Sequence, residues 1–541
     1  MNREGAKGAK IIAKEFNLWE RLVDEAVQQI AGSWEFVLPE ILLVVTACVH
    51  FLVAPFLVGE RGEALAGLRH RWGGLALFAL LAAAFLWWRT SPLADGANLG
   101  LFRADSLTWF IRGLALAAGV ILLLASWNRI DDAHAAEHHA SLLLITAGVA
   151  LVGAANDLVV LFLSLELVSI ATYVMLYLGR NDAAGQEGVV KYFLMSVLSS
   201  AIVLFGLSYL YGVTGTTNLT AMHAALAAGG TAAMPPALLI AIAAVVAGLG
   251  FRITAAPFHY YAPDVFQGTG IGGAAMLSFI PKIAGFVALL RLLASPIESV
   301  ANWTLIEQAE PILWGLAILS MTLGNILALF QTNIWRLLAY SSVAHAGYML
   351  VGLAVVPHEG ARVAGAPALL FYLAVYGAMT VGVFAILAAM RLGKPERDSL
   401  TDHQSNGRES ISDRIEAISD LAGLGRTNSS AALLMTLFLF SLTGLPPTAG
   451  FFAKLNLFLA AWSVETTVAQ WTAVVMAVNA MIAAWYYLRI VIVMYLRAPE
   501  NATSRRMEPP ALLGAALCAA ATIGIFIVPD WLWQAAARVV G

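Results

Sequence analysis

Long apolar runs separated by short polar stretches dominate the sequence. A helix that crosses a bilayer needs about 20 mostly apolar residues, and fourteen runs of this kind occur along the chain. They predict transmembrane helices at about 36–59, 72–88, 107–127, 140–155, 157–178, 189–212, 236–256, 271–295, 311–331, 337–356, 367–391, 431–460, 468–496 and 510–534. The pattern therefore predicts an all-α integral membrane protein, with a transmembrane domain over residues 35–534.

Two polar segments stand apart from these runs. Residues 1–34 carry apolar side chains at roughly helical spacing, which predicts an amphipathic N-terminal extension outside the membrane. Whether this extension docks a partner or is incidental stays open. Residues 393–430 are rich in Ser, Asp, Arg and Asn, and they predict a cytoplasmic loop.

The placement of Lys and Arg predicts how the chain lies in the membrane. Most basic residues between the predicted helices follow odd-numbered helices, for example Arg61, Arg129 and Arg180. Basic residues in short loops favour the cytoplasmic side, so both termini are expected on the outer side. Lys7 and Lys10 in the N-terminal extension argue the other way.

Composition excludes several classes of protein. Hydrophobic residues make up 60% of the chain and charged residues 12%, against about 25% charged residues in soluble proteins. The mean hydropathy is +0.78. A soluble enzyme, a nucleic-acid binder and a disordered scaffold are therefore excluded. The two cysteines, Cys48 and Cys518, are too few for a thiolate iron–sulfur cluster or a cysteine-rich zinc site within the chain.

Two ionisable residues lie near the middle of apolar runs. Glu166 has no basic residue one helical turn away, and Lys282 lies in AAMLSFIPKIAGFVALLRLL. A charge in the centre of a membrane helix costs about 2.5–3.5 kcal/mol, so such residues face protein or a cavity and are candidates for function. For Glu166, a purely structural ion pair between helices is the alternative. Lys282 suits a proton relay, because burial favours the neutral form of an amine.

Two further cations lie beside interruptions of apolar runs. Arg252 precedes Pro257 and Pro263, and Lys454 follows a cluster of Gly and Pro residues in LTGLPPTAGFFAK. Irregular backbone at membrane depth occurs where it is buried in protein or lines a cavity. Both sites are therefore predicted to be broken helices, whose occurrence in two halves of a chain is typical of inverted-repeat transporters.

His345 is a weaker candidate. It is flanked by Ser341 and Ser342 and could pass a proton between charged sites. A hydrogen bond between helices is the competing interpretation. The histidines of the apolar runs are isolated in sequence, which argues against paired haem ligands.

Seven motifs follow one another along the chain: LFLSLELVSIATYVML (161–176), KYFL (191–194), PFHYYAPDVFQG (257–268), PKIAGF (281–286), QTNIWRLLAYSSVAHAGY (331–348), DLAGLGR (420–426) and GLPPTAGFFAK (444–454). In sequence and order they resemble motifs of the antiporter-like subunits of proton-pumping NADH-quinone oxidoreductase (respiratory complex I). The resemblance covers about residues 36–500 and is greatest for the N type of subunit, because PDV, PK-AGF and PPTAGFFAK occur together.

This resemblance implies fourteen helices, two inverted five-helix repeats at about 140–295 and 311–496, and a polar axis in the membrane plane. It also implies a role for each of the buried residues. Glu166 would pair with the cation of the first broken helix, Arg252, while Lys282 would connect the halves and Lys454 would serve the second broken helix. Polar residues of lesser weight would be Lys191, His259 and His345.

The resemblance also implies partners and a location. The chain itself would bind no cofactor, and NADH, FMN, iron–sulfur clusters and quinone would belong to other subunits. Its partners would be other membrane subunits of the complex and the lipid bilayer, with no nucleic acid. The location would be the bacterial plasma membrane.

Two departures from the family pattern stand out. The family usually has lysine where this chain has Arg252, which puts in doubt any step that needs this group to lose a proton. The stretch QGTGIGGAA replaces the usual EGAPTPVTA, and its glycines are expected to loosen the loop. Two other functions stay open: a subunit of a multi-protein cation/proton antiporter, and a membrane scaffold whose charges only hold helices together.

Overall fold

The computed structural model describes residues 34–58, 64–89, 97–180, 182–228, 235–294, 305–358, 362–392, 414–498 and 505–539. The predicted amphipathic extension, apart from Trp34, lies outside the described residues. The same holds for residues 393–413 of the predicted cytoplasmic loop.

Helices make up almost all of the described structure. The long helices are α2 (Leu38–Leu57), α3 (Leu68–Arg89), α4 (Ser106–Ser126), α5 (Ala135–Ala154), α6 (Leu158–Gly179), α7 (Ala183–Thr214), α9 (Pro236–Arg252), α11 (Ile271–Leu293), α12 (Leu305–Leu329), α13 (Ile334–Val355), α14 (Arg362–Ala389), α16 (Ser429–Thr443), α17 (Ala449–Trp462), α18 (Thr467–Leu496) and α19 (Pro509–Ile527). Short helices are α8 (Leu219–Ala228), α10 (Ala262–Gly268), η4 (Ile418–Leu421), α15 (Leu424–Thr427) and α20 (Pro529–Ala537).

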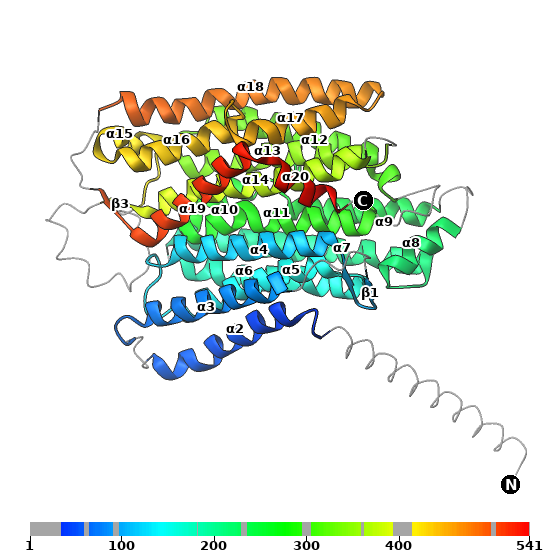
Figure 1. The fold of residues 1–541 in the computed structure, drawn as a ribbon, viewed down its shortest axis with the longest axis horizontal. Coiled ribbons are helices and arrows are strands. Elements are labelled where there is room, and N and C mark those ends of the chain that lie inside the picture. Colours follow the sequence, from blue (N-terminus) through cyan, green and yellow to red (C-terminus); the bar gives the residue numbers. More distant parts are fainter. Residues whose placement is uncertain are drawn as a thin grey trace, which may run out of the picture.

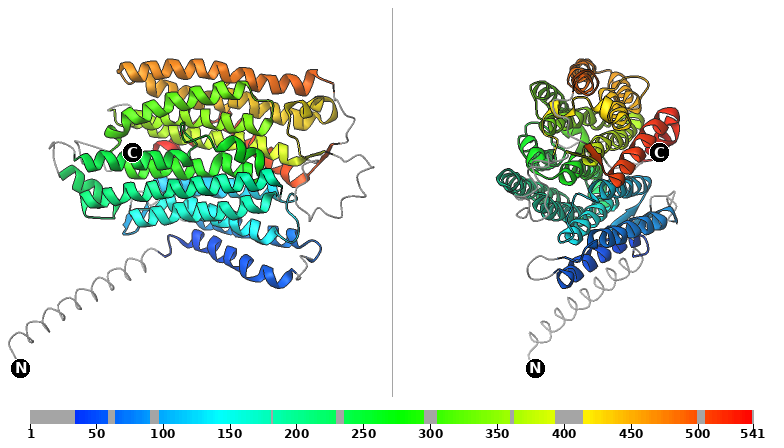
Figure 2. Two further views of the ribbon diagram at one scale, coloured as in Figure 1. Left: turned by 180° about the vertical axis from the view of Figure 1, so that it is seen from behind. Right: turned by 90° about the vertical axis from the view of Figure 1, so that its left-hand side faces the viewer.

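The long helices lie side by side with roughly parallel axes, as the two side views show (Figures 1 and 2). Twelve of the described helices are long and apolar enough to cross a membrane. Two small antiparallel ribbons complete the fold: β1 (Ala97–Leu99) with β2 (Phe102–Ala104), and β3 (Met390–Leu392) with β4 (Arg505–Met507). The all-helical membrane architecture predicted from the apolar runs is confirmed.

Each predicted run coincides with described helix, and the differences have local causes. The adjoining runs 140–155 and 157–178 are separate helices, because the carboxylate of Asp157 accepts hydrogen bonds from the amides of Val159 and Val160 and starts α6. The run 431–460 is two helices, α16 and α17, as its Gly and Pro residues indicated. The run 236–256 ends early, at Arg252.

The glycines of QGTGIGGAA are closely packed, so the expected loose loop is wrong. Gly268 ends α10, and Gly272 and Gly273 lie inside the first turn of α11. A Cβ atom at Gly268 would collide with the carbonyl oxygen of Ala184, and one at Gly273 would meet Leu176. These glycines therefore allow neighbouring helices to approach one another.

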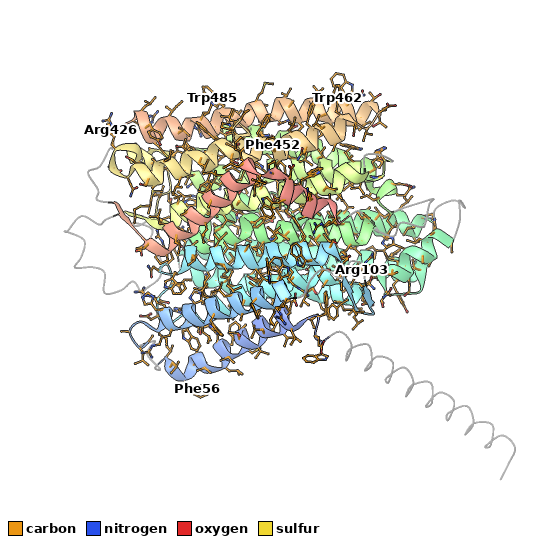
Figure 3. The ribbon with its side chains drawn as sticks, in the orientation of Figure 1. Phe56, Arg103, Arg426, Phe452, Trp462 and Trp485 are labelled. Atoms are coloured by element: carbon orange, nitrogen blue, oxygen red, sulfur yellow. The ribbon has the colours of Figure 1, made fainter. Side chains whose placement is uncertain are left out.

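Burial separates an inner set of helices from an outer set. The membrane-length window of α11 is 100% buried within the chain, and those of α13 and α14 are 94% buried. The corresponding windows of α2, α3 and α18 are about a third buried, and large apolar side chains such as Phe56 and Trp485 point outward from them (Figure 3). The outer helices present apolar surface, whereas the inner helices α11 and α13 carry Lys282 and His345.

Candidate functional site

The first broken helix brings Arg252 to its last helical position. After α9 the backbone turns, with Thr254 in the left-handed region at φ 58°, before α10 begins at Ala262. Pro257 lacks an N–H group and cannot continue the helical hydrogen-bond ladder, whereas Pro263 lies in the first turn of α10, where that donor is not needed. The side chain of Arg252 is thereby held at a helix end inside the bundle, 5% exposed.

Arg252 and Glu166 form an ion pair between α9 and α6. The Arg252 Nη2 atom lies 3.0 Å from Glu166 Oε1. Ser200 of α7 donates a hydrogen bond to the same carboxylate oxygen, and Arg252 Nη1 donates one to Ser169 Oγ at 2.8 Å and one to the carbonyl of Leu165 at 3.1 Å. Two hydroxyls and a carbonyl thus support a guanidinium whose charge is fixed.

Lys282 lies in the middle of α11 and is fully buried. Its Nζ atom donates a hydrogen bond of 2.5 Å to the hydroxyl oxygen of Thr254, in the turn after α9. No carboxylate among the described residues forms an ion pair with this amine. Lys282 is therefore a fully buried amine beside a hydroxyl.

A cluster of hydroxyl groups surrounds His345 of α13. Its Nδ1 atom is 2.7 Å from the hydroxyl of Tyr372, and its Nε2 atom is 3.2 Å from that of Tyr487. Tyr376, whose ring centroid lies 5.0 Å from that of His345, donates hydrogen bonds to the carbonyl of Ser278 in α11 and to Ser342 Oγ. The cluster therefore reaches from the helix of Lys282 across to α18.

The second broken helix places Lys454 against a helix end. The residue after α16 is Gly444, at φ 86°, and α17 begins at Ala449. Lys454 Nζ donates hydrogen bonds to the carbonyls of Leu442 at 2.9 Å and Thr443 at 2.8 Å. It also lies 5.0 Å from the centroid of the Tyr348 ring. The last carbonyls of a helix lack internal partners and carry partial negative charge, so they stabilise the ammonium in place of a carboxylate.

Lys191 and His259 lie away from these contacts. Lys191 is 41% exposed and pairs with Glu187 at 2.6 Å and with Asp264 at 2.8 Å. Asp264 also pairs with Arg336 of α13 at 2.6 Å, so it joins α10 to both α7 and α13. The ring of His259 is 6.4 Å from that of Tyr340, and its Nδ1 atom is buried without a hydrogen-bond partner in the described part of the chain.

Comparison with known proteins places this arrangement in a family. Residues 155–482 match the family model described as NADH:quinone oxidoreductase/Mrp antiporter, transmembrane. NADH-quinone oxidoreductase subunit N 1 of Solibacter usitatus (strain Ellin6076) is 34% identical over 505 residues, which are 93% of this chain and 96% of that protein. The chain belongs to the N-type, antiporter-like subunits of this family. The resemblance inferred from the seven motifs is confirmed, including the choice of the N type.

Solved structures agree with this assignment. A chain of respiratory complex I from Thermus thermophilus with bound aureothin is 26% identical, with a TM-score of 0.73, over 92% of this chain and 99% of that chain. A chain of the Mrp complex from Dietzia sp. DQ12-45-1b has a TM-score of 0.74 at 20% identity, over 93% and 97% of the two chains. The second likeness concerns the fold alone.

Several polar residues that contact these candidate residues were not identified as site residues from the sequence. They are Ser169, Ser200, Thr254, Asp264, Tyr372, Tyr376 and Tyr487. Tyr372 and Tyr376 lie one helical turn apart in an apolar run, a spacing that places both on one face. Thr254 gave no signal, because only the break in α9 brings it to Lys282. Within the described ranges, no group of His, Cys, Asp or Glu could hold a metal ion.

Proposed function

We propose that this chain translocates protons as a membrane subunit of an NADH-quinone oxidoreductase. Quinone reduction elsewhere in the complex would drive proton transfer along the buried axis of Glu166, Arg252, Lys282 and Lys454. The observation that carries the proposal is a pair of buried lysines without carboxylate partners in the described structure, with the His345 hydroxyl cluster between their helices. Family membership supports it.

Arg252 is the switch in this proposal. Its guanidinium keeps its charge, so it acts by moving rather than by losing a proton. Two unit charges about 4 Å apart interact by roughly 4 kcal/mol at an effective dielectric of 20. When Arg252 leaves Glu166 and approaches Lys282, repulsion of that order favours release of the Lys282 proton. Replacement of the family's usual lysine by arginine is compatible with this role.

The His345 cluster provides groups that accept and donate protons along the onward path. Tyr376 contacts the backbone of α11 at Ser278, one turn before Lys282, and its ring packs against His345. Tyr487 links His345 to Ser341, and Lys454 packs over Tyr348, the ring that meets His345 edge-on. Lys454 would receive the proton and release it on the outer side. Lys191 and His259 serve as minor members of the axis.

We also propose the finer architecture that the family implies. The twelve helices that are long enough to cross a membrane, with the broken pairs α9/α10 and α16/α17, would give fourteen crossings. Ten of these would form two inverted five-helix repeats, at about 140–295 and 311–496. The loops that carry most basic residues would face the cytoplasm, and both termini the outer side of a bacterial plasma membrane. Other antiporter-like and small membrane subunits would pack on the apolar outer helices, while NADH, FMN, iron–sulfur clusters and quinone would bind to other subunits.

The test replaces each lysine in the assembled complex. In membrane vesicles we expect Lys282→Ala and Lys454→Ala to abolish the proton pumping that depends on this subunit, because each removes a proton-binding group. Protons translocated per electron and subunit content are measured together. Lys394→Ala, outside the apolar runs, is the matched control and should pump normally.

Each other outcome points to a different function. A normal proton-to-electron ratio in both lysine variants would refute the proposal. Loss of assembly with either variant would favour a scaffold whose charges hold helices together. Sodium-driven proton movement in vesicles without an electron donor would favour the cation/proton antiporter.

A further inference from the structure

The turn between α9 and α10 contains an unusual backbone conformation. Thr254 is the one non-glycine residue with a positive φ in the described part of the chain, at 58°. β-branched residues rarely adopt this region. Such conformations persist where the surroundings impose them, and they cluster at functional sites. Thr254 is also only 3% exposed, so protein groups rather than water surround this part of the backbone.

Hydrogen bonds on both sides fix this turn. The amide of Thr254 donates to the carbonyl of Phe251 at 3.0 Å, and that of Ala255 donates to Gly250 at 2.8 Å. The amide of Ala256, two residues after Thr254, donates to Ser320 Oγ of α12 at 2.9 Å. The turn is thus attached to α9 on one side and to α12 on the other.

The same turn connects the two charged sites of the first half. Arg252 reaches Glu166, and Thr254, two residues later, accepts the hydrogen bond from Lys282. Ile253, which lies between Arg252 and Thr254, packs directly on α11 at Gly285. Its Cγ2 atom would lie only 2.5 Å from a Cβ atom at that glycine. The turn therefore packs against α11 without free space, next to the hydroxyl that holds Lys282.

We propose that Thr254 is a positioning residue that couples the Glu166–Arg252 ion pair to Lys282. While the ion pair is closed, the strained turn holds the hydroxyl against the Lys282 amine. Opening the ion pair relaxes the turn and withdraws the hydroxyl. The Thr254 hydroxyl donates its hydrogen to the carbonyl of Ile253 at 2.6 Å and therefore acts as an acceptor toward Lys282. Both an ammonium and a neutral amine carry N–H groups that can donate to it. This inference rests on the proposed function and adds the link between its first two steps.

Three substitutions separate the hydroxyl from the backbone conformation. Thr254→Val keeps the shape and removes the hydroxyl, Thr254→Ser keeps the hydroxyl, and Thr254→Gly favours a positive φ while removing the hydroxyl. Proton pumping, quinone reduction and the pH profile of both are measured in vesicles that contain the assembled complex. The content of this subunit in the complex is measured alongside.

We expect Thr254→Ser to resemble the unsubstituted protein. Thr254→Val should slow proton pumping about tenfold, the size expected for losing a hydrogen bond to a charged group, and should shift its pH profile while quinone reduction is less affected. Thr254→Gly should do the same and assembles even where the valine variant does not. A normal proton-to-electron ratio and pH profile in the glycine or the valine variant would overturn the inference.

Lys282→Ala distinguishes this failure from failure of the proposed function. If Lys282→Ala pumps normally, the proposed axis is wrong. If Lys282→Ala abolishes pumping and Thr254→Val does not change it, the axis stands and the coupling role of Thr254 falls.

Discussion

The two broken helices stabilise their cations in different ways. Arg252, at the end of α9, pairs with the carboxylate of Glu166 and with the hydroxyls of Ser169 and Ser200. Lys454, near the start of α17, has no carboxylate partner in the described structure and donates to the last carbonyls of α16. The first site holds a full counter-charge, whereas the second offers only the partial charges of a helix end.

This difference suits different tasks. A guanidinium paired with a carboxylate keeps its proton and is released only when the pair separates, so it responds to electrostatic change. An amine held by carbonyls at a helix end loses part of its stabilisation whenever those carbonyls move. The first break is therefore suited to switching and the second to proton release. Under the proposed function, the departure from lysine to arginine at position 252 affects a site that would require charge rather than proton exchange.

The largest effect is expected when Lys454, at the second broken helix, is replaced by arginine, the residue found at the first. Lys454→Arg retains a positive charge but cannot release a proton at physiological pH. We expect it to abolish the proton pumping that depends on this subunit, as Lys454→Ala does. Protons per electron in vesicles provide the measurement, and subunit content in the purified complex controls for assembly. Pumping at the normal ratio would show that Lys454, like Arg252, needs only its charge.

An intermediate effect is expected when the first site loses its counter-charge. Glu166→Gln retains a hydrogen-bonding side chain but leaves Arg252 without its carboxylate. The lost charged hydrogen bonds are worth about 1.5–3 kcal/mol, so the solubilised complex should unfold at a lower temperature and pump more slowly. Glu166→Asp, which retains the charge, is the control. Unchanged pumping and unfolding would mean that the ion pair is neither a switch nor a support.

The smallest effect is expected from restoring the residue usual in the family. Arg252→Lys keeps a cation beside Glu166 and should be tolerated, with some loss because an ammonium cannot reach Leu165, Ser169 and Glu166 in the geometry of a guanidinium. Pumping rates of the two forms, compared at equal subunit content, test this. If Arg252→Lys is inactive, the role of the first site depends on the guanidinium itself.

The sequence predicts the membrane helices well because length and apolarity determine them. The helix break at α16/α17 was predicted for a different reason, because Gly444 and the following prolines interrupt the apolar run. The short elements α8, α10 and α20 were not predicted. α8 and α10 lie between apolar runs and α20 at the end of one, where packing rather than composition decides whether a turn of helix forms.

The candidate site was only partly predictable. Charged residues in apolar runs are conspicuous, which is why Glu166, Lys282 and Lys454 were selected, although their roles remain predictions. Hydroxyl-bearing residues are not conspicuous, because buried Ser and Thr commonly bond to their own helix backbone and buried Tyr packs as other aromatic side chains do. Tyr487 and Thr254 become part of the site only through contacts across 142 and 28 positions of the sequence, and no local pattern encodes such contacts.

The complete enclosure of α11 has a consequence for how the protein is made. The helix packs against α4, α5, α6 and α9, which precede it in the chain, and against α13 and α14, which follow it. When α11 first enters the membrane, Lys282 can already contact Thr254, but α13 and α14, which later cover α11, have not yet been synthesised. The exposed lysine then costs about 2.5–3.5 kcal/mol, which is recovered when the second half of the chain closes around it. A chain truncated after α12 would leave this cost uncompensated, so the second half is needed for the first half to reach its final structure.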